Sequence, residues 1–108
     1  MKVISLGSRE ELAAALKKNK LVVVMFGASF CGHCKNIAPL FEMLSEEKEM
    51  KKIFFAKVEC GQAKDLARDE KITGFPTFKF YRKGRERFSF AGADPDNLKS
   101  KLRELKEL

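Results

Sequence analysis

The chain has 108 residues, of which 44% are hydrophobic and 34% charged, and it contains ten Phe and no Trp. This composition is typical of one globular domain, and it excludes a disordered or fibrous protein. The longest apolar run, residues 21–28, is too short for a membrane helix, which needs about 20 residues. The net charge of +7 favours acidic partners. Because the basic residues are spread along the chain without a nucleic-acid motif, a nucleic acid is not the expected partner.

The first predicted elements are a short strand at residues 3–6 and a helix that begins behind Ser8. Ser8 and Glu11 have the spacing of a capping box, in which each side chain accepts a free backbone N–H at the helix start. Residues 21–26 then form an unbroken, β-branched apolar run. Such a run predicts a strand that is buried on both faces.

A turn at residues 27–30 leads into the second predicted helix, which we expect to begin at Cys34. Ile37, Phe41 and Leu44 have helical spacing, and Pro39 between them should kink the helix.

The second half of the chain predicts a buried strand at residues 53–59, a short helix at 63–69 and a hairpin of strands 77–82 and 85–91. Asp94-Pro95 is typical of a helix start, and that helix should bury its leucines. The predicted order is β-α-β-α-β-α-β-β-α. It indicates the α/β class, with a central mixed sheet between helices, and a single domain spanning residues 1–108.

Two of the three cysteines, Cys31 and Cys34, form a C-x-x-C motif between the buried strand and the second helix. A cysteine at a helix start faces free N–H groups and the positive end of the helix dipole, and both stabilise a thiolate. Gly32 should allow a tight turn and an open approach to Cys31, and a protonated His33 should further stabilise the thiolate. We therefore expect Cys31 to attack a partner's disulfide and Cys34 to resolve the mixed disulfide.

The cysteines could also serve as half of a zinc site, as an iron–sulfur site across a dimer, or as a structural disulfide. Structural zinc normally needs four ligands, and only Cys60 and His33 remain as candidates, so no metal is expected. Cys60, which follows the third strand, is either a buried spare thiol or a regulatory thiol that forms a dimer or a glutathione adduct.

Gly74-Phe75-Pro76-Thr77 opens the fourth strand. A proline at the start of a strand can follow a cis peptide bond, and it lacks the N–H that would bond a neighbouring backbone. An extended peptide could therefore add here like an edge strand.

The chain resembles the thioredoxin family over nearly its whole length. The residues that carry the resemblance are Val22 to Lys35, Pro39, Lys57-Val58, Gly74 to Thr77, Lys83-Gly84 and Gly92. The resemblance implies the thioredoxin fold, with a five-stranded sheet, four helices and the dithiol at the end of the second strand.

The resemblance also implies roles for individual residues. Cys31 is then the nucleophile and Cys34 the resolving thiol, and Pro76 is cis and packs against the dithiol. The backbone of Phe75 pairs with the substrate, and Phe30 is an apolar platform. The remaining implied residues are Gly74 and Gly92 for substrate approach, and Gly32, His33 and Lys57 for tuning the redox properties.

Three positions depart from the usual family pattern. His33 replaces a proline and gives Cys-Gly-His-Cys, which resembles protein disulfide isomerase domains. The reduction potentials of the two classes differ by about 90 mV, roughly 4 kcal/mol for two electrons. Met25 replaces a buried carboxylate that accepts the proton of the resolving cysteine and pairs with Lys57. Gly27 replaces a bulky aromatic residue, which should widen the space beside the active-site loop.

We expect a thioredoxin-type protein disulfide reductase, and we retain two alternatives: an isomerase-type oxidase domain and a non-catalytic scaffold. No cofactor is expected beyond the Cys31–Cys34 disulfide, with NADPH supplying electrons through a separate thioredoxin reductase. No apolar signal-peptide core follows Met1, so we expect a cytoplasmic protein. We also expect it to be a monomer and to act on disulfide-containing proteins. The endoplasmic reticulum remains the alternative location if a leader was removed.

Overall fold

The structure is a computed structural model that describes residues 2–108. The strands are β1 (Val3–Ser5), β2 (Leu21–Gly27), β3 (Ile53–Glu59), β4 (Thr77–Arg82) and β5 (Arg85–Ala91). The helices are α1 (Arg9–Lys18), α2 (Gly32–Ser45), α3 (Lys64–Asp69) and α4 (Pro95–Lys106), with a 3₁₀ turn at Lys48–Met50.

The five strands form one mixed sheet in the order β1-β3-β2-β4-β5. β1 and β2 pair with β3 in parallel, whereas β4 pairs with β2 and β5 in antiparallel fashion. β2 is therefore central, and all seven of its residues are buried. This confirms the predicted mixed sheet and places the carboxyl end of β2 in the middle of one end of the sheet.

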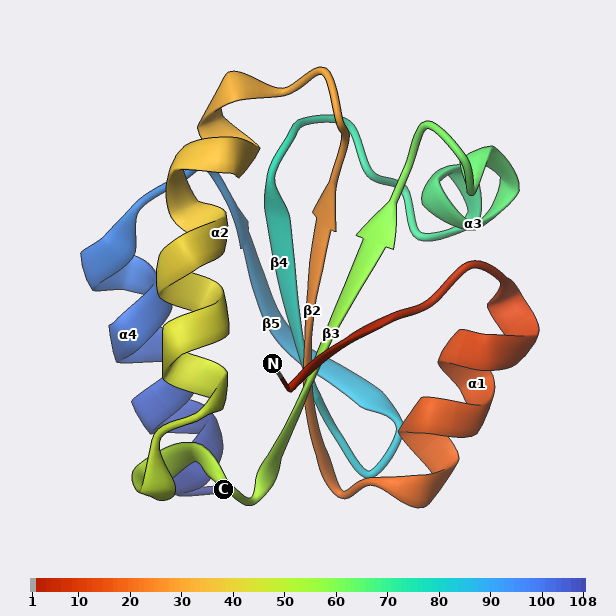
Figure 1. The fold of residues 1–108 in the computed structure, drawn as a ribbon. Helices are drawn as coiled ribbons and strands as arrows, with labels where there is room; N and C mark the ends of the chain where they lie inside the picture. The colour runs from red at the N-terminus through yellow and green to blue at the C-terminus, as the bar shows by residue number, and fades with distance from the viewer. Residues whose placement is uncertain (1) are drawn as a thin grey trace.

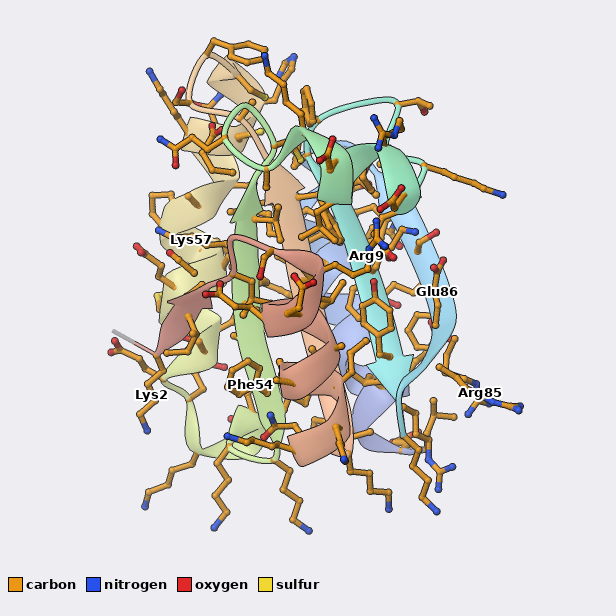
Figure 2. The ribbon with its side chains drawn as sticks, turned by 90° about the vertical axis from the view of Figure 1, so that its right-hand side faces the viewer. Lys2, Arg9, Phe54, Lys57, Arg85 and Glu86 are labelled. Atoms are coloured by element: carbon orange, nitrogen blue, oxygen red, sulfur yellow. The ribbon has the colours of Figure 1, made fainter. Side chains whose placement is uncertain are left out.

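Helices cover both faces of the sheet: α2 and α4 lie on one face and α1 and α3 on the other (Figure 1). The face covered by α1 is turned toward the viewer in Figure 2. Because side chains alternate along a strand, Val23 and Met25 pack toward α2 and α4 while Val22 and Val24 pack toward α1. The sheet thus separates two apolar cores, and the first of them contains Met25.

The start of α2 differs from the prediction. The helix begins at Gly32, two positions before the expected Cys34, and Cys31 is its N-cap. Gly27, predicted as the start of the turn, is instead the last residue of β2. The helix continues through Pro39, and the kink expected there stays a prediction.

The predicted capping residues of α1 and α4 are present. Ser8 accepts the N–H of Glu11 at 3.1 Å, and Glu11 reaches back to the N–H of Gly7 at 2.6 Å rather than to that of Ser8. Asp94 accepts the N–H of Asn97 at 3.1 Å, ahead of Pro95. Across residues 2–108, none of the helices has the length and apolar character needed to cross a bilayer.

Candidate active site

The two cysteines of the C-x-x-C motif lie together where β2 leads into α2. The Sγ of Cys31 accepts the backbone N–H of Cys34 at 3.2 Å, which makes this sulfur the N-cap of the helix. Both thiols are free, and their sulfurs are 2.6 Å apart. The two sulfurs are thus placed so that a disulfide bond, about 2.05 Å long, can form between them when a substrate disulfide takes up the two electrons.

The environments of the two thiols differ. Cys31 is half-buried, whereas Cys34 is only 6% exposed and packs in the first turn of α2. Burial, followed by the hydrogen bond with Cys31, raises the pKa of Cys34 to about 11. The same pair therefore offers one accessible sulfur at a helix N-terminus and one protected thiol behind it.

Gly32 and His33 are both exposed in the first turn of α2. A Cβ at Gly32 would meet nothing within 4 Å, which agrees with an open approach to Cys31. The backbone of Gly32 does not adopt the left-handed conformation, however, so the tight turn that we expected there is not what requires glycine.

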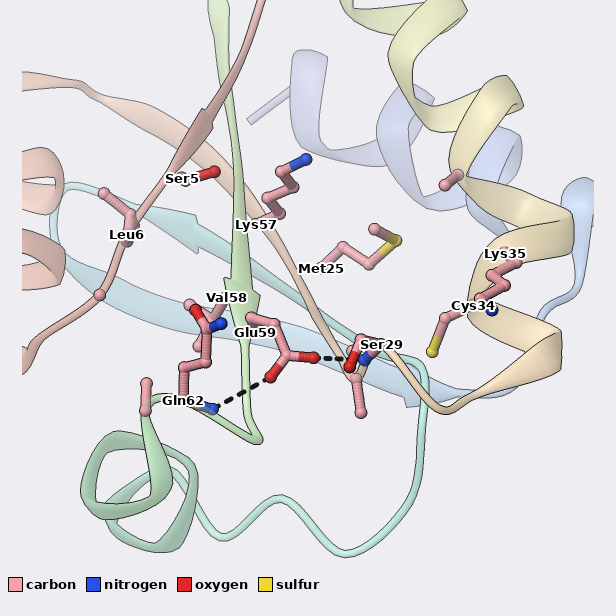
Figure 3. A pocket seen from close by; sticks show the side chains of 15 residues that line it. Ser5, Leu6, Met25, Ser29, Cys34, Lys35, Lys57, Val58, Glu59 and Gln62 are labelled. Atoms are coloured by element: carbon pink, nitrogen blue, oxygen red, sulfur yellow. Dashed lines mark hydrogen bonds between the residues drawn. The ribbon is translucent and has the colours of Figure 1, made fainter.

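A cavity of about 540 Å³ lies behind Cys34, between the start of α2 and strands β1 and β3 (Figure 3). Met25 and Lys57 occupy paired positions of β2 and β3, and both line this cavity together with Cys34 and Gly27. A Cβ at Gly27 would lie 3.1 Å from the Sγ of Cys34. A side chain at position 27 would therefore compete with this sulfur for space.

The sequence analysis missed Glu59, the last residue of β3. Its carboxylate accepts the N–H of Ser29 in the active-site loop and the N–H of Gln62 at 3.0 Å (Figure 3). Glu59 thus ties the loop that carries the dithiol to the turn before α3. Its position could have indicated this, because the carboxyl ends of adjacent parallel strands meet at the same edge of a sheet.

The segment that opens β4 lies beside the dithiol loop. The Phe75–Pro76 peptide bond is cis, and Pro76 is buried. Phe30 is 76% exposed, and its ring meets that of Phe75 edge to face at 6.0 Å between centroids.

Two hydrogen bonds hold the segment before β4. Gly92, at a φ of 111°, donates its N–H to the carbonyl of Pro76 at 2.8 Å. The carbonyl of Gly74 accepts the hydroxyl of Thr77 at 2.7 Å.

Cys60 lies in the core on the α1 side and is only 4% exposed. Burial, with a smaller contribution from the neighbouring Glu59, raises the pKa of this thiol to about 11. The buried position favours the spare-thiol interpretation over the regulatory one. Within residues 2–108, no three His, Cys, Asp or Glu side chains gather in a way that could hold a metal ion.

Comparisons with known proteins give one consistent result. The family model described as Thioredoxin matches residues 3–104. The thioredoxin of Ictalurus punctatus is 38% identical over 106 residues, which cover 96% of this chain and 99% of that protein. Human thioredoxin is 38% identical over 87 residues, 81% of each chain. The solved structure of Fasciola hepatica thioredoxin matches with a TM-score of 0.90 and 35% identity, covering 95% of this chain and 99% of that one.

The family-model match spans the complete sheet and the cysteine pair that it positions. In this family the redox-active group is the protein's own cysteine pair, and the reducing equivalents come from NADPH. The chain is accordingly a thioredoxin-type oxidoreductase that exchanges its dithiol with the disulfides of protein substrates. It belongs to the thioredoxin family.

Proposed function

We propose that Cys31 is the attacking thiolate and Cys34 the resolving thiol of a protein disulfide reductase. The observation that carries this assignment is the asymmetry of the pair: an accessible sulfur at the N-cap of α2 and a buried thiol 2.6 Å behind it. The helix N-terminus stabilises negative charge on Cys31. Exclusion of solvent keeps Cys34 protonated until it attacks the mixed disulfide.

The exchange then takes two steps. The Cys31 thiolate attacks one sulfur of the substrate disulfide, that S–S bond breaks, and the other substrate sulfur leaves as a thiolate. Cys34 next gives up its proton to the solvent and attacks the Sγ of Cys31. The second substrate sulfur leaves as a thiolate, and the Cys31–Cys34 disulfide forms. Two electrons have passed to the substrate, whose disulfide is now a dithiol.

Neighbouring residues have supporting roles in this proposal. His33, exposed two residues after Cys31, stabilises the thiolate when it is protonated, and Gly32 leaves the approach to the sulfur open. Lys57, in the wall of the cavity behind Cys34, supplies positive charge on that side. These three residues tune the balance between the dithiol and the disulfide.

The substrate-binding surface in this proposal consists of the residues beside Cys31. Phe30 and Phe75 provide apolar contact, since their rings touch and Phe30 is largely exposed. Pro76 has no N–H, so the backbone at Gly74 and Phe75 can pair with an extended substrate segment. Gly92, bonded to Pro76, has no side chain to obstruct that segment.

The wider setting of the reaction follows from the family. The oxidised pair is reduced again by a thioredoxin reductase that uses NADPH, and the protein acts as a monomer in the cytoplasm. Residues 1–108 form a single domain in this proposal. The family match across residues 3–104 supports it.

Trapping the mixed disulfide tests the assignment. A Cys34→Ser variant can attack but cannot resolve, so it is expected to accumulate a covalent adduct with a disulfide-bonded protein, visible by mass spectrometry and released by reductant. The matched Cys31→Ser variant is expected to form no adduct. An adduct on Cys34 in the Cys31→Ser variant, at a comparable rate, would contradict the assignment.

The raised pKa of Cys34 predicts that the rate of resolution of the mixed disulfide depends on pH. Burial, the largest cause of the raised pKa of Cys34, also acts in the mixed disulfide, whereas the hydrogen bond and charge of Cys31 do not. The pKa of Cys34 should therefore stay above neutral pH, and the rate of resolution should rise by up to about tenfold per pH unit between pH 7 and 9. Single-turnover release of the substrate dithiol measures this rate, and a flat profile over the same range would refute the prediction.

A further inference from the structure

Basic residues that are scattered in the sequence gather at the end of the molecule opposite the dithiol. Residues 17–20, the end of α1 and the two residues after it, precede the start of β2, and the hairpin turn 82–85 lies beside them because Leu21 pairs with Arg82. Cys31 follows the other end of β2. The two segments contain no Asp or Glu, and their cationic residues are Lys17, Lys18, Lys20, Arg82, Lys83 and Arg85. Figure 2 shows long side chains with terminal nitrogens extending from this end, Arg85 among them.

A depression of about 680 Å³ lies between these two segments. Lys17, Lys20 and Lys83 line it, and Ala13 and Leu16 of α1 form an apolar wall. None of the residues that line it is acidic. The depression is therefore a concave surface with several positive charges on its rim.

A main-chain hydrogen bond joins the two segments of the depression. The N–H of Lys83 donates to the carbonyl of Lys20 at 2.8 Å. Lys83 and Gly84 have φ values of 52° and 81°, as a two-residue hairpin turn requires. A Cβ at Gly84 would meet nothing within 4 Å, so the backbone of the turn is open to a ligand.

The lysines that line the depression lack counter-charges. Over residues 2–108, the side chains of Lys17, Lys20 and Lys83 have no hydrogen-bond or ion-pair partner, in contrast to Lys79 and Lys101. The buried Nε of Arg82 also has no acceptor within the same range. Like charges held side by side repel one another, and a multivalent anion between them relieves that repulsion.

We propose that this depression binds a small molecule bearing two or more phosphate groups. Lysine ammonium groups bind phosphate as point charges without a fixed geometry, which suits three long side chains on an open rim. An oligophosphate brings several negative charges into a space of this size, and the wall of Ala13 and Leu16 accommodates an apolar part of the ligand. The site lies away from the dithiol, so the proposal is independent of the redox assignment.

Titration with inorganic tripolyphosphate at constant ionic strength, followed by amide NMR, tests the proposal. Saturable shifts are expected at Lys83, Gly84 and the end of α1, with none at Cys31. A Lys17→Gln/Lys20→Gln/Lys83→Asn variant should bind roughly tenfold more weakly or worse, since it removes the three positive charges that line the depression.

The matched control is Lys64→Gln/Lys71→Asn/Lys99→Gln, which also removes three positive charges. Asn suits both Lys71 and Lys83 because both have a positive φ, of 59° and 52°. The control should bind tripolyphosphate within about twofold of the unmodified chain, because its substitutions lie outside the depression. Equal weakening in both variants, or no saturable shift in the unmodified chain, would overturn the proposal. A DNA duplex or anionic vesicle that binds more tightly than tripolyphosphate through residues outside the depression would also overturn it.

Discussion

Replacing Cys31 by serine is expected to reduce protein disulfide reduction to the uncatalysed background, a loss on the order of 10³-fold or more. A hydroxyl cannot form the mixed disulfide, and Cys34 cannot replace Cys31 because its thiol is buried and has a pKa of about 11. The measurement is NADPH oxidation in the presence of thioredoxin reductase and a disulfide-bonded protein substrate.

Cys60→Ala is the matched control for Cys31→Ser. It also removes one thiol, but from a position that is 4% exposed in the core on the α1 side. We expect its rate to stay within about twofold of the original, since a buried thiol with a raised pKa takes no part in the exchange. An equal loss in both variants would show that the Cys31 effect is not specific, and substantial turnover by Cys31→Ser would refute the assignment.

Replacing Met25 by aspartate is expected to speed resolution of the mixed disulfide by about tenfold or more at neutral pH. Met25 lines the cavity that contains Cys34, and it pairs in register with Lys57 of β3. A carboxylate there would accept the proton of Cys34, and the ammonium group of Lys57 would help to keep that carboxylate ionised. The rate of substrate dithiol release in a single turnover measures the effect.

The same substitution should lower the free energy of unfolding by about 2–4 kcal/mol, because it buries a polar group and removes apolar packing. Met25 is 7% exposed and belongs to the core on the α2 side. Met25→Asn is the control, since it has a similar stability cost but cannot take up a proton at neutral pH. Faster resolution in the Met25→Asp variant, without faster resolution in Met25→Asn, would identify proton transfer from Cys34 as the cause. Unchanged kinetics in Met25→Asp would refute the prediction, and equal acceleration in both would point to loosened packing instead.

The strands were predictable because their signals are local. The apolar run of β2 and the alternating Phe residues of the β4–β5 hairpin each indicate a strand without reference to the rest of the chain. The start of α2 was misplaced for a physical reason. Gly32 is a poor helix former, and the N-cap is a sulfur rather than the oxygen that capping rules anticipate.

The cysteine pair was also predictable, since its spacing and its place between a strand and a helix are both in the sequence. The cavity behind Cys34 was not, because Met25, Lys57 and Ala38 come from three different elements. The charged end opposite the dithiol was missed for the same reason. Its basic residues lie in two segments that are more than 60 residues apart in the sequence and meet only through the pairing of β2 with β4.

The close approach of Gly27 to Cys34 constrains how this active site can change in evolution. Even alanine at position 27 would require the Cys34 sulfur to move by a few tenths of an ångström. A side chain at position 27 therefore needs a compensating shift of the Cys34 side chain in the first turn of α2. Substitutions at position 27 should accordingly be accompanied by changes around Cys34 among descendants of this sequence.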